Sequence, residues 1–121
     1  MAVILVVEDD ALIRMVAEMM LQDQGHDTLT ASDQDEALSI LRSPQHIDAL
    51  FTDIYLKTAV LGGCDLARQA IALRPGLRVL YTTGNSLTDK MRDLFIVGTH
   101  CLGKPYTQQQ LHESVDNMLS A

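Results

Sequence analysis

Three consecutive acidic residues, Glu8, Asp9 and Asp10, follow the first apolar segment of the chain, and Asp53 follows a later one. Adjacent carboxylates repel one another unless they are solvated, cap a helix or hold a cation. Taken alone, Asp9 or Asp10 could cap a helix, and Asp53 could be a solvated acid in a turn. Brought together, these hard oxygen ligands would suit Mg²⁺ rather than zinc.

Two further motifs end apolar segments later in the chain. In Thr82-Thr83-Gly84 a hydroxyl precedes a residue without a side chain, where a tetrahedral anion could approach the backbone N–H. Lys104, before Pro105, could neutralise a phosphoryl oxygen if it lay beside the carboxylates. Considered singly, the first motif is better explained by an ordinary turn, and the second can be explained by a lysine in a surface loop.

The spacing of apolar residues predicts the elements that position these motifs. Short apolar segments without alternation are typical of strands covered on both faces. We expect strands at residues 2–7, 26–31, 47–52, 77–82 and 99–103. Helical spacing predicts helices after Asp10, between Ser32 and Pro44, at 65–73, more weakly at 87–95, and after Thr107.

Particular residues are expected to begin, end or pack these helices. Gly25 should stop the first helix, whose core face is expected to be methionine-rich. That face comprises Leu12, Met15, Val16, Met19 and Met20. Ser32-x-x-Asp35 and Thr107-x-x-Gln110 have the spacing of capping boxes.

Five alternating strand–helix units predict an α/β, doubly wound parallel sheet with helices on both faces. Ligands of such sheets bind outside the carboxyl ends of the strands. The acidic residues, the Thr-Gly pair and the Lys-Pro pair all lie at those ends. We therefore expect them to meet at one edge of the sheet.

In combination, these motifs resemble those of the receiver domains of bacterial two-component response regulators. The matching segments are VVEDD (6–10), FTDIYL (51–56), VLYTTG (79–84) and LGKPY (102–106), and the resemblance covers essentially the whole chain. It implies a flavodoxin-like fold with strand order 2-1-3-4-5. Because a chain of 121 residues fits one domain, we expect one stand-alone receiver domain over residues 1–121, with no output domain on this chain.

The resemblance also assigns roles to individual residues. Asp53 would be the phosphoryl acceptor, Asp9 a direct Mg²⁺ ligand and Glu8 a ligand acting through water. The backbone carbonyl of Tyr55 would complete the protein's share of the metal shell. Thr83 would be the switch hydroxyl. Gly84 would leave access to the phosphoryl group and Lys104 would contact it, with a cis peptide bond before Pro105.

Four positions depart from, or vary within, the family pattern. Lys57 stands where relatives usually carry proline, and the segment up to Gly63 is slightly longer than usual. Cys101 replaces the usual aromatic residue that couples to the switch hydroxyl, and we expect it to be buried. Tyr55 and Asn85 occupy positions that influence the lifetime of the aspartyl phosphate.

The function implied is that of a phosphoacceptor switch. A sensor histidine kinase or phosphotransfer protein would supply the phosphoryl group, and a separate downstream protein would receive the signal. We expect a signalling protein rather than a turnover enzyme. A receiver-like interaction module that works without phosphorylation is an alternative. A haloacid-dehalogenase-type phosphohydrolase is disfavoured because Tyr55 stands where it needs a second Asp, and an FMN carrier because the first loop is acidic.

Composition limits the function further. The 121 residues carry a net charge of −7 with scattered basic residues, which argues against direct nucleic-acid binding. The longest apolar run is far shorter than the roughly 20 residues of a membrane helix, so we expect a cytoplasmic protein without membrane contact. Cys64 and Cys101 form no C-x-x-C motif, so no disulfide framework or zinc site is expected.

Overall fold

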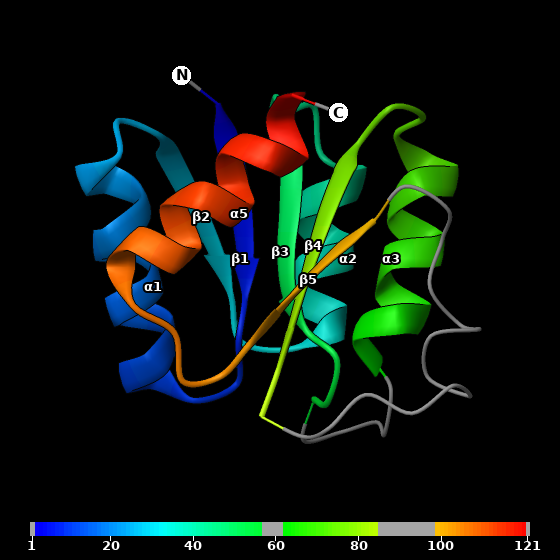
Figure 1. The fold of residues 1–121 in the computed structure, drawn as a ribbon. Coiled ribbons are helices and arrows are strands. Elements are labelled where there is room, and N and C mark those ends of the chain that lie inside the picture. The colour runs from blue at the N-terminus through cyan, green and yellow to red at the C-terminus, as the bar shows by residue number, and fades with distance from the viewer. Residues whose placement is uncertain (1, 57–61, 85–98, 121) are drawn as a thin grey trace.

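The structure, a computed structural model, describes residues 2–56, 62–84 and 99–120. This part of the chain forms a five-stranded parallel sheet in the order β2-β1-β3-β4-β5 (Figure 1), which confirms the predicted fold class and strand order. The strands are β1 (Val3–Val7), β2 (Asp27–Ala31), β3 (Ala49–Asp53), β4 (Arg78–Thr83) and β5 (His100–Gly103). Each lies within one or two residues of its expected position.

Helices cover both faces of the sheet. On one face lie α1 (Ala11–Asp23) and α5 (Gln108–Ser120), and on the other lie α2 (Gln34–Arg42) and α3 (Gly62–Leu73) (Figure 1). α3 begins three residues earlier than expected. The expected helix at 87–95 lies outside the described residues.

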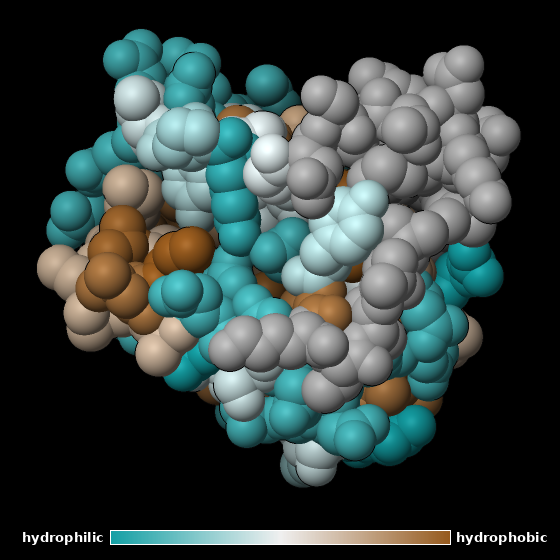
Figure 2. All heavy atoms as spheres, turned by 90° about the horizontal axis from the view of Figure 1, so that it is seen from below, coloured by the Kyte–Doolittle hydropathy of each residue, from teal (hydrophilic) through white to brown (hydrophobic). Residues whose placement is uncertain are grey.

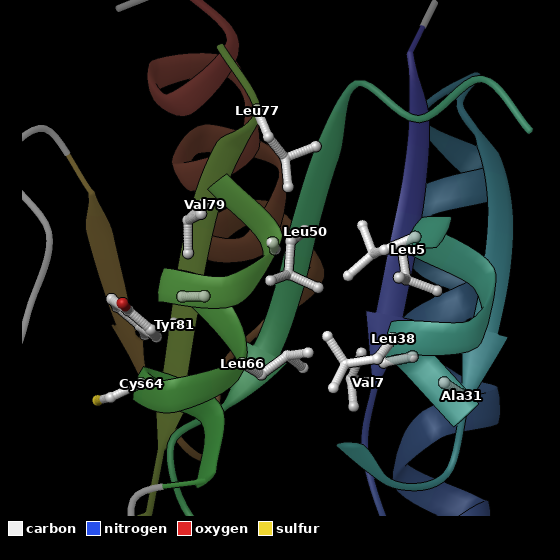
Figure 3. Close-up of a cluster of buried hydrophobic side chains, with 14 of the residues drawn as sticks. Leu5, Val7, Ala31, Leu38, Leu50, Cys64, Leu66, Leu77, Val79 and Tyr81 are labelled. Atoms are coloured by element: carbon white, nitrogen blue, oxygen red, sulfur yellow. The ribbon is translucent and has the colours of Figure 1, made fainter. Parts of the chain in front are cut away.

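Alternation along the strands divides the core into two layers. Leu5 and Val7 of β1 join the cluster beneath α2 and α3 that Figure 3 shows, whereas Ile4 and Val6 pack on the side of α1 and α5. Successive strand residues point to opposite faces, so a strand covered on both sides needs an unbroken apolar run. This explains the composition of β1.

Helix ends follow the expected capping chemistry, with one correction. Thr107 and Gln110 cap α5 reciprocally, because each backbone N–H donates to the other residue's side-chain oxygen, at 2.9 and 3.1 Å. Gly25, with φ of 98°, ends α1 as predicted. The expected box at Ser32 and Asp35 is wrong: Asp33 is the N-cap of α2 and accepts from the Glu36 N–H at 2.8 Å.

The predicted core face of α1 is also wrong, except at Met20, which is partly buried and packs against the core. Leu12 is 64% exposed, Met15 50% and Met19 58%, while Ala17 and Leu21 are the buried residues of the helix. The small Ala17 side chain lets the helix lie close to the sheet. The larger apolar side chains therefore form a second stripe that faces outward, which apolar spacing alone does not distinguish from the buried one.

Candidate phosphoacceptor and metal site

The carboxyl ends of β1 and β3 bring three acidic side chains together. β1 pairs with β3, so Glu8 and Asp9, which follow β1, lie beside Asp53 at the end of β3. Carboxylate oxygens of Glu8, Asp9 and Asp53 all lie within 4.8 Å of one another. This is a donor set of hard oxygens that fits a divalent cation such as Mg²⁺.

Lys104 neutralises part of this acidic cluster. Its Nζ donates to Glu8 Oε1 at 2.5 Å and to Asp53 Oδ2 at 2.8 Å. Burial by itself would lower the pKa of Lys104, but its contacts with Asp53 and Glu8 outweigh this and raise the pKa above its ordinary value. Lys104 therefore stays charged between the two carboxylates.

Glu8 is the most enclosed of the three acids, with 4% of the residue exposed. Burial raises the pKa of its carboxyl group, although Lys104 and the Asp10 N–H oppose the shift. The Asp10 N–H donates to Glu8 Oε2 at 3.1 Å, and the Arg14 guanidinium donates to the Glu8 carbonyl at 2.7 Å. Both contacts hold the turn between β1 and α1.

Asp10 has a different role from its two acidic neighbours. One of its carboxylate oxygens accepts from the Leu12 and Ile13 N–H groups, each at 3.0 Å, so that Asp10 is the N-cap of α1. The capping interpretation is thus confirmed for Asp10. Asp9 remains in the acidic cluster.

Asp53 is held through both its side chain and its backbone. The residue is 7% exposed, and its Oδ1 accepts from the Tyr55 N–H at 3.1 Å. The Thr52 hydroxyl donates to the Asp53 carbonyl at 3.0 Å. Gly63 lies against the same carbonyl, since a Cβ at position 63 would be 1.9 Å from its oxygen.

Thr52 and Gly63 are contacts of the candidate acceptor that sequence reasoning missed. The pair Gly62-Gly63, just ahead of the helix expected at 65–73, was the available signal, because glycine permits a close approach of backbone. The sequence around Thr52 carried no signal that its hydroxyl would donate to the carbonyl of Asp53.

β4 and β5 deliver the remaining predicted residues to the same edge. Thr83 ends β4 and is buried, and the exposed Gly84 follows it. The Lys104 N–H donates to the Thr83 carbonyl at 2.8 Å, which ties the ends of β4 and β5 together. The peptide bond between Lys104 and Pro105 is cis, as the resemblance implied.

Cys101 lies on β5 opposite Tyr81 of β4. It is only partly buried, which corrects the expectation that it would be buried. Tyr81 is fully buried and belongs to the core layer against which Cys101 packs. The other predicted departures, at Lys57 and Asn85, lie outside the described residues.

An apolar groove borders the acidic cluster on the α1 side. It has a volume of about 540 Å³ and is lined by Leu12, Ile13, Val16, Met20, Lys104 and Tyr106, among others. Figure 2, which looks onto this edge of the sheet, shows the apolar patch of α1 beside hydrophilic residues. Lys104 belongs to both features, because it lines the groove and contacts Asp53.

No helix in the described ranges is long and apolar enough to span a membrane.

Comparison with known proteins gives a consistent family. A family model described as the response regulator receiver domain matches residues 4–116. The chain is 27% identical over 111 residues to Protein PilG of Pseudomonas aeruginosa, covering 89% of this chain and 80% of PilG. It is 26% identical to the probable transcriptional regulator ycf27 of Porphyridium aerugineum, covering 96% of this chain and 47% of that protein.

Part of a sensor kinase is also similar. The chain is 31% identical over 113 residues to the sensor histidine kinase RcsC of Escherichia coli, covering 93% of this chain and 12% of RcsC. It therefore spans less than half the length of both RcsC and ycf27.

Solved structures show the same fold. A response regulator receiver protein from Sinorhizobium medicae WSM419 superimposes with a TM-score of 0.89 at 28% identity, covering 99% of this chain and 95% of that one. A receiver domain protein from Clostridium thermocellum gives a TM-score of 0.83 at 28% identity, with the same coverage of 99% and 95%.

Proposed function

Since the chain belongs to the response regulator receiver family, we propose that it is a phosphoacceptor switch whose acceptor is Asp53. A histidine kinase or a phosphotransfer protein supplies the phosphoryl group, and a separate partner receives the signal. The chain acts as a signalling protein rather than a turnover enzyme.

One observation carries this proposal: the Asp53 carboxylate contacts a cation and lies beside an acidic pair. Lys104 Nζ is 2.8 Å from Asp53 Oδ2, while oxygens of Glu8 and Asp9 lie within 4.8 Å of an Asp53 oxygen. A nucleophilic carboxylate needs positive charge near the group it attacks, and it needs a second cation to offset the other carboxylates.

The residues that would hold this second cation are Glu8, Asp9, Asp53 and the backbone carbonyl of Tyr55. Carboxylate and carbonyl oxygens with space left for water are the ligands that Mg²⁺ prefers. When bound, Mg²⁺ would offset negative charge on the phosphoryl oxygens.

The proposed transfer forms one bond and breaks one. A carboxylate oxygen of Asp53 attacks phosphorus as the bond from phosphorus to the donor's histidine nitrogen breaks, and the electron pair returns to the imidazole. Lys104 stabilises one phosphoryl oxygen. Thr83 donates its hydroxyl to another, and Gly84 leaves its backbone accessible to the same group.

The groove beside Asp53 is the proposed docking surface of the phosphodonor protein. A histidine that reaches Asp53 must be carried by a surface that lies against the surrounding residues, and the α1 groove shares Lys104 with the acceptor. Asp9 and Asp10 directly precede α1, the helix that lines the groove, so the partner should present an apolar helix flanked by basic residues. Two copies of this chain, each with a net charge of −7, would repel one another there.

Intact mass spectrometry after incubation with acetyl phosphate and Mg²⁺ tests the function. One phosphoryl mass should appear on the wild type, and hydroxylamine should remove it. Asp53→Asn should gain no mass, and chelation of Mg²⁺ should prevent the reaction in the wild type. A wild type that stays unmodified, with acetyl phosphate and with a phosphorylated kinase, would instead support an interaction module that works without phosphorylation.

A further inference from the structure

The backbone carbonyl of Asp53 is confined by two neighbours. The Thr52 hydroxyl, on a fully buried side chain, donates to this oxygen at 3.0 Å. Gly63 approaches it from the first turn of α3, where a Cβ would lie 1.9 Å from the oxygen and 2.8 Å from the carbonyl carbon. The crowding atoms are backbone and cannot rotate away as a flexible side chain could.

The peptide that follows Asp53 is fixed as well. The Gly63 N–H donates to the Ile54 carbonyl at 3.0 Å, and the Ile54 N–H donates to the Thr82 carbonyl at 2.9 Å. α3 and β4 thus hold the residue next to the acceptor from two directions. Rotation of the backbone at Asp53 would break one of these contacts.

Side-chain placement depends on this backbone. Asp53 Oδ2 must stay within reach of Lys104 Nζ, and Oδ1 within reach of the Tyr55 N–H. A short aspartate side chain has only two rotatable bonds, so a tilt of its backbone moves the carboxylate directly. A displacement of about 1 Å in reacting groups slows a reaction on the order of 100-fold.

We infer that Thr52 and Gly63 are positioning residues for the phosphoacceptor and act through the Asp53 carbonyl. The inference rests on the proposed role of Asp53. Neither residue touches the transferred group. Thr52 holds the carbonyl by a hydrogen bond, and Gly63 holds it by close packing that any larger residue would disturb.

Thr52→Val tests the hydrogen bond at nearly constant volume. We expect the maximal rate of phosphorylation by acetyl phosphate to fall about 10-fold, with the Mg²⁺ dissociation constant changed by less than about threefold. Thr52→Ser keeps the hydroxyl and should recover most of the rate. Thr82→Val is the matched control, because the buried Thr82 hydroxyl has no hydrogen-bond partner among the described residues.

Gly63→Ala tests the packing contact, with Gly103→Ala as its control. A Cβ at Gly103 meets nothing within 4 Å, so that variant should react like the wild type. Gly63→Ala should lower the maximal rate at least as much as Thr52→Val does. Urea unfolding of each variant shows whether the protein assayed is folded. If Gly63→Ala does not fold, the comparison of Thr52→Val with Thr52→Ser tests the inference by itself.

Equal rates for Thr52→Val, Thr52→Ser and the wild type would overturn the inference, as would an equal loss in Thr82→Val. A wild type that accepts no phosphoryl group, or an Asp53→Asn variant that still accepts one, would instead overturn the proposed function. The two failures are therefore distinguishable.

Discussion

Lys104 and the acidic residues around it make different contacts at the carboxyl edge of the sheet. Its ammonium group contacts Glu8 and Asp53. Both oxygens of Glu8 already accept hydrogen bonds, one from Lys104 and one from the Asp10 N–H. A cation that bound Glu8 directly would therefore compete with both of these contacts.

Because both Glu8 oxygens already accept hydrogen bonds, we expect Glu8 and Asp9 to contribute unequally to metal binding. Asp9→Ala should weaken Mg²⁺ binding about 10-fold more than Glu8→Ala, because a direct carboxylate ligand opposes the divalent charge more strongly than one acting through water. Titration of both variants with Mg²⁺ measures the difference, and Asp35→Ala on α2 controls for net charge. Equal losses would remove the distinction between the two roles.

A second residue-scale prediction concerns pH. The Ala2 N–H donates to His26 Nδ1 at 3.0 Å, and burial lowers the pKa of His26 below its ordinary value of 6.5. The unfolded chain therefore binds a proton at this residue more readily than the folded chain does. The free energy of unfolding should fall as the pH drops from about 6.5 toward the lower folded pKa.

Urea unfolding of the wild type and His26→Asn between pH 8 and 5 checks this. Asparagine can offer an acceptor near the position of Nδ1 but does not titrate, so the variant should lose less stability below about pH 6.5. Parallel curves for the two proteins would mean that His26 contributes nothing to the pH dependence.

Among the elements, α1 differs most from expectation, and its outward stripe has a testable role. Leu12→Ser should slow phosphotransfer from a phosphorylated histidine phosphotransfer protein about 10-fold, since interface anchors carry much of the binding free energy. Phosphorylation by acetyl phosphate should be unchanged, because the Asp53 carboxylate is held by Lys104 and the Tyr55 N–H rather than by Leu12. Leu73→Ser on α3, where Leu73 is 43% exposed, is the matched control.

Equal loss with both donors would place Leu12 in the acceptor site instead. No loss with either donor would show that the α1 groove is not the docking surface.

The hydrogen bond between the ends of β4 and β5 indicates how the switch could work with Cys101 in place of an aromatic residue. The Thr83 carbonyl accepts from the Lys104 N–H, so movement of Thr83 toward a phosphoryl group reaches β5 directly. Addition of beryllofluoride and Mg²⁺ should shift the backbone amide NMR signals of β5 in the wild type and in Cys101→Ala. Thr83→Ala should lose most of these shifts.

The opposite pattern, with β5 shifts kept in Thr83→Ala and lost in Cys101→Ala, would contradict this route. Binding of beryllofluoride to both variants, followed by fluorine NMR, confirms that the comparison is made on occupied sites.

At the scale of the whole molecule, the sheet assembles a site from residues far apart in the sequence. Glu8 and Lys104 are separated by 96 positions, yet they are joined by a hydrogen bond. A parallel sheet places the carboxyl ends of all its strands at one edge, so residues that follow β1, β3, β4 and β5 converge there.

The same geometry explains what could be predicted from the sequence. Unbroken apolar runs indicated doubly covered strands, and the convergence of Glu8, Asp9, Asp53 and Lys104 followed from their positions after those strands. The face of α1 could not be predicted, because two apolar stripes compete and packing of Ala17 decides between them. The contact of Gly63 with Asp53 could not be predicted either, because it depends on where α3 lies relative to β3.

The central claim is that Asp53 accepts a phosphoryl group. Borohydride reduces an aspartyl phosphate to homoserine, so reduction after incubation with acetyl phosphate and Mg²⁺ marks the acceptor permanently. Sequencing of the digested protein by mass spectrometry should find homoserine at position 53 and aspartate at positions 9 and 10. Homoserine at another position, or a reaction that leaves all aspartates unchanged, would contradict the account.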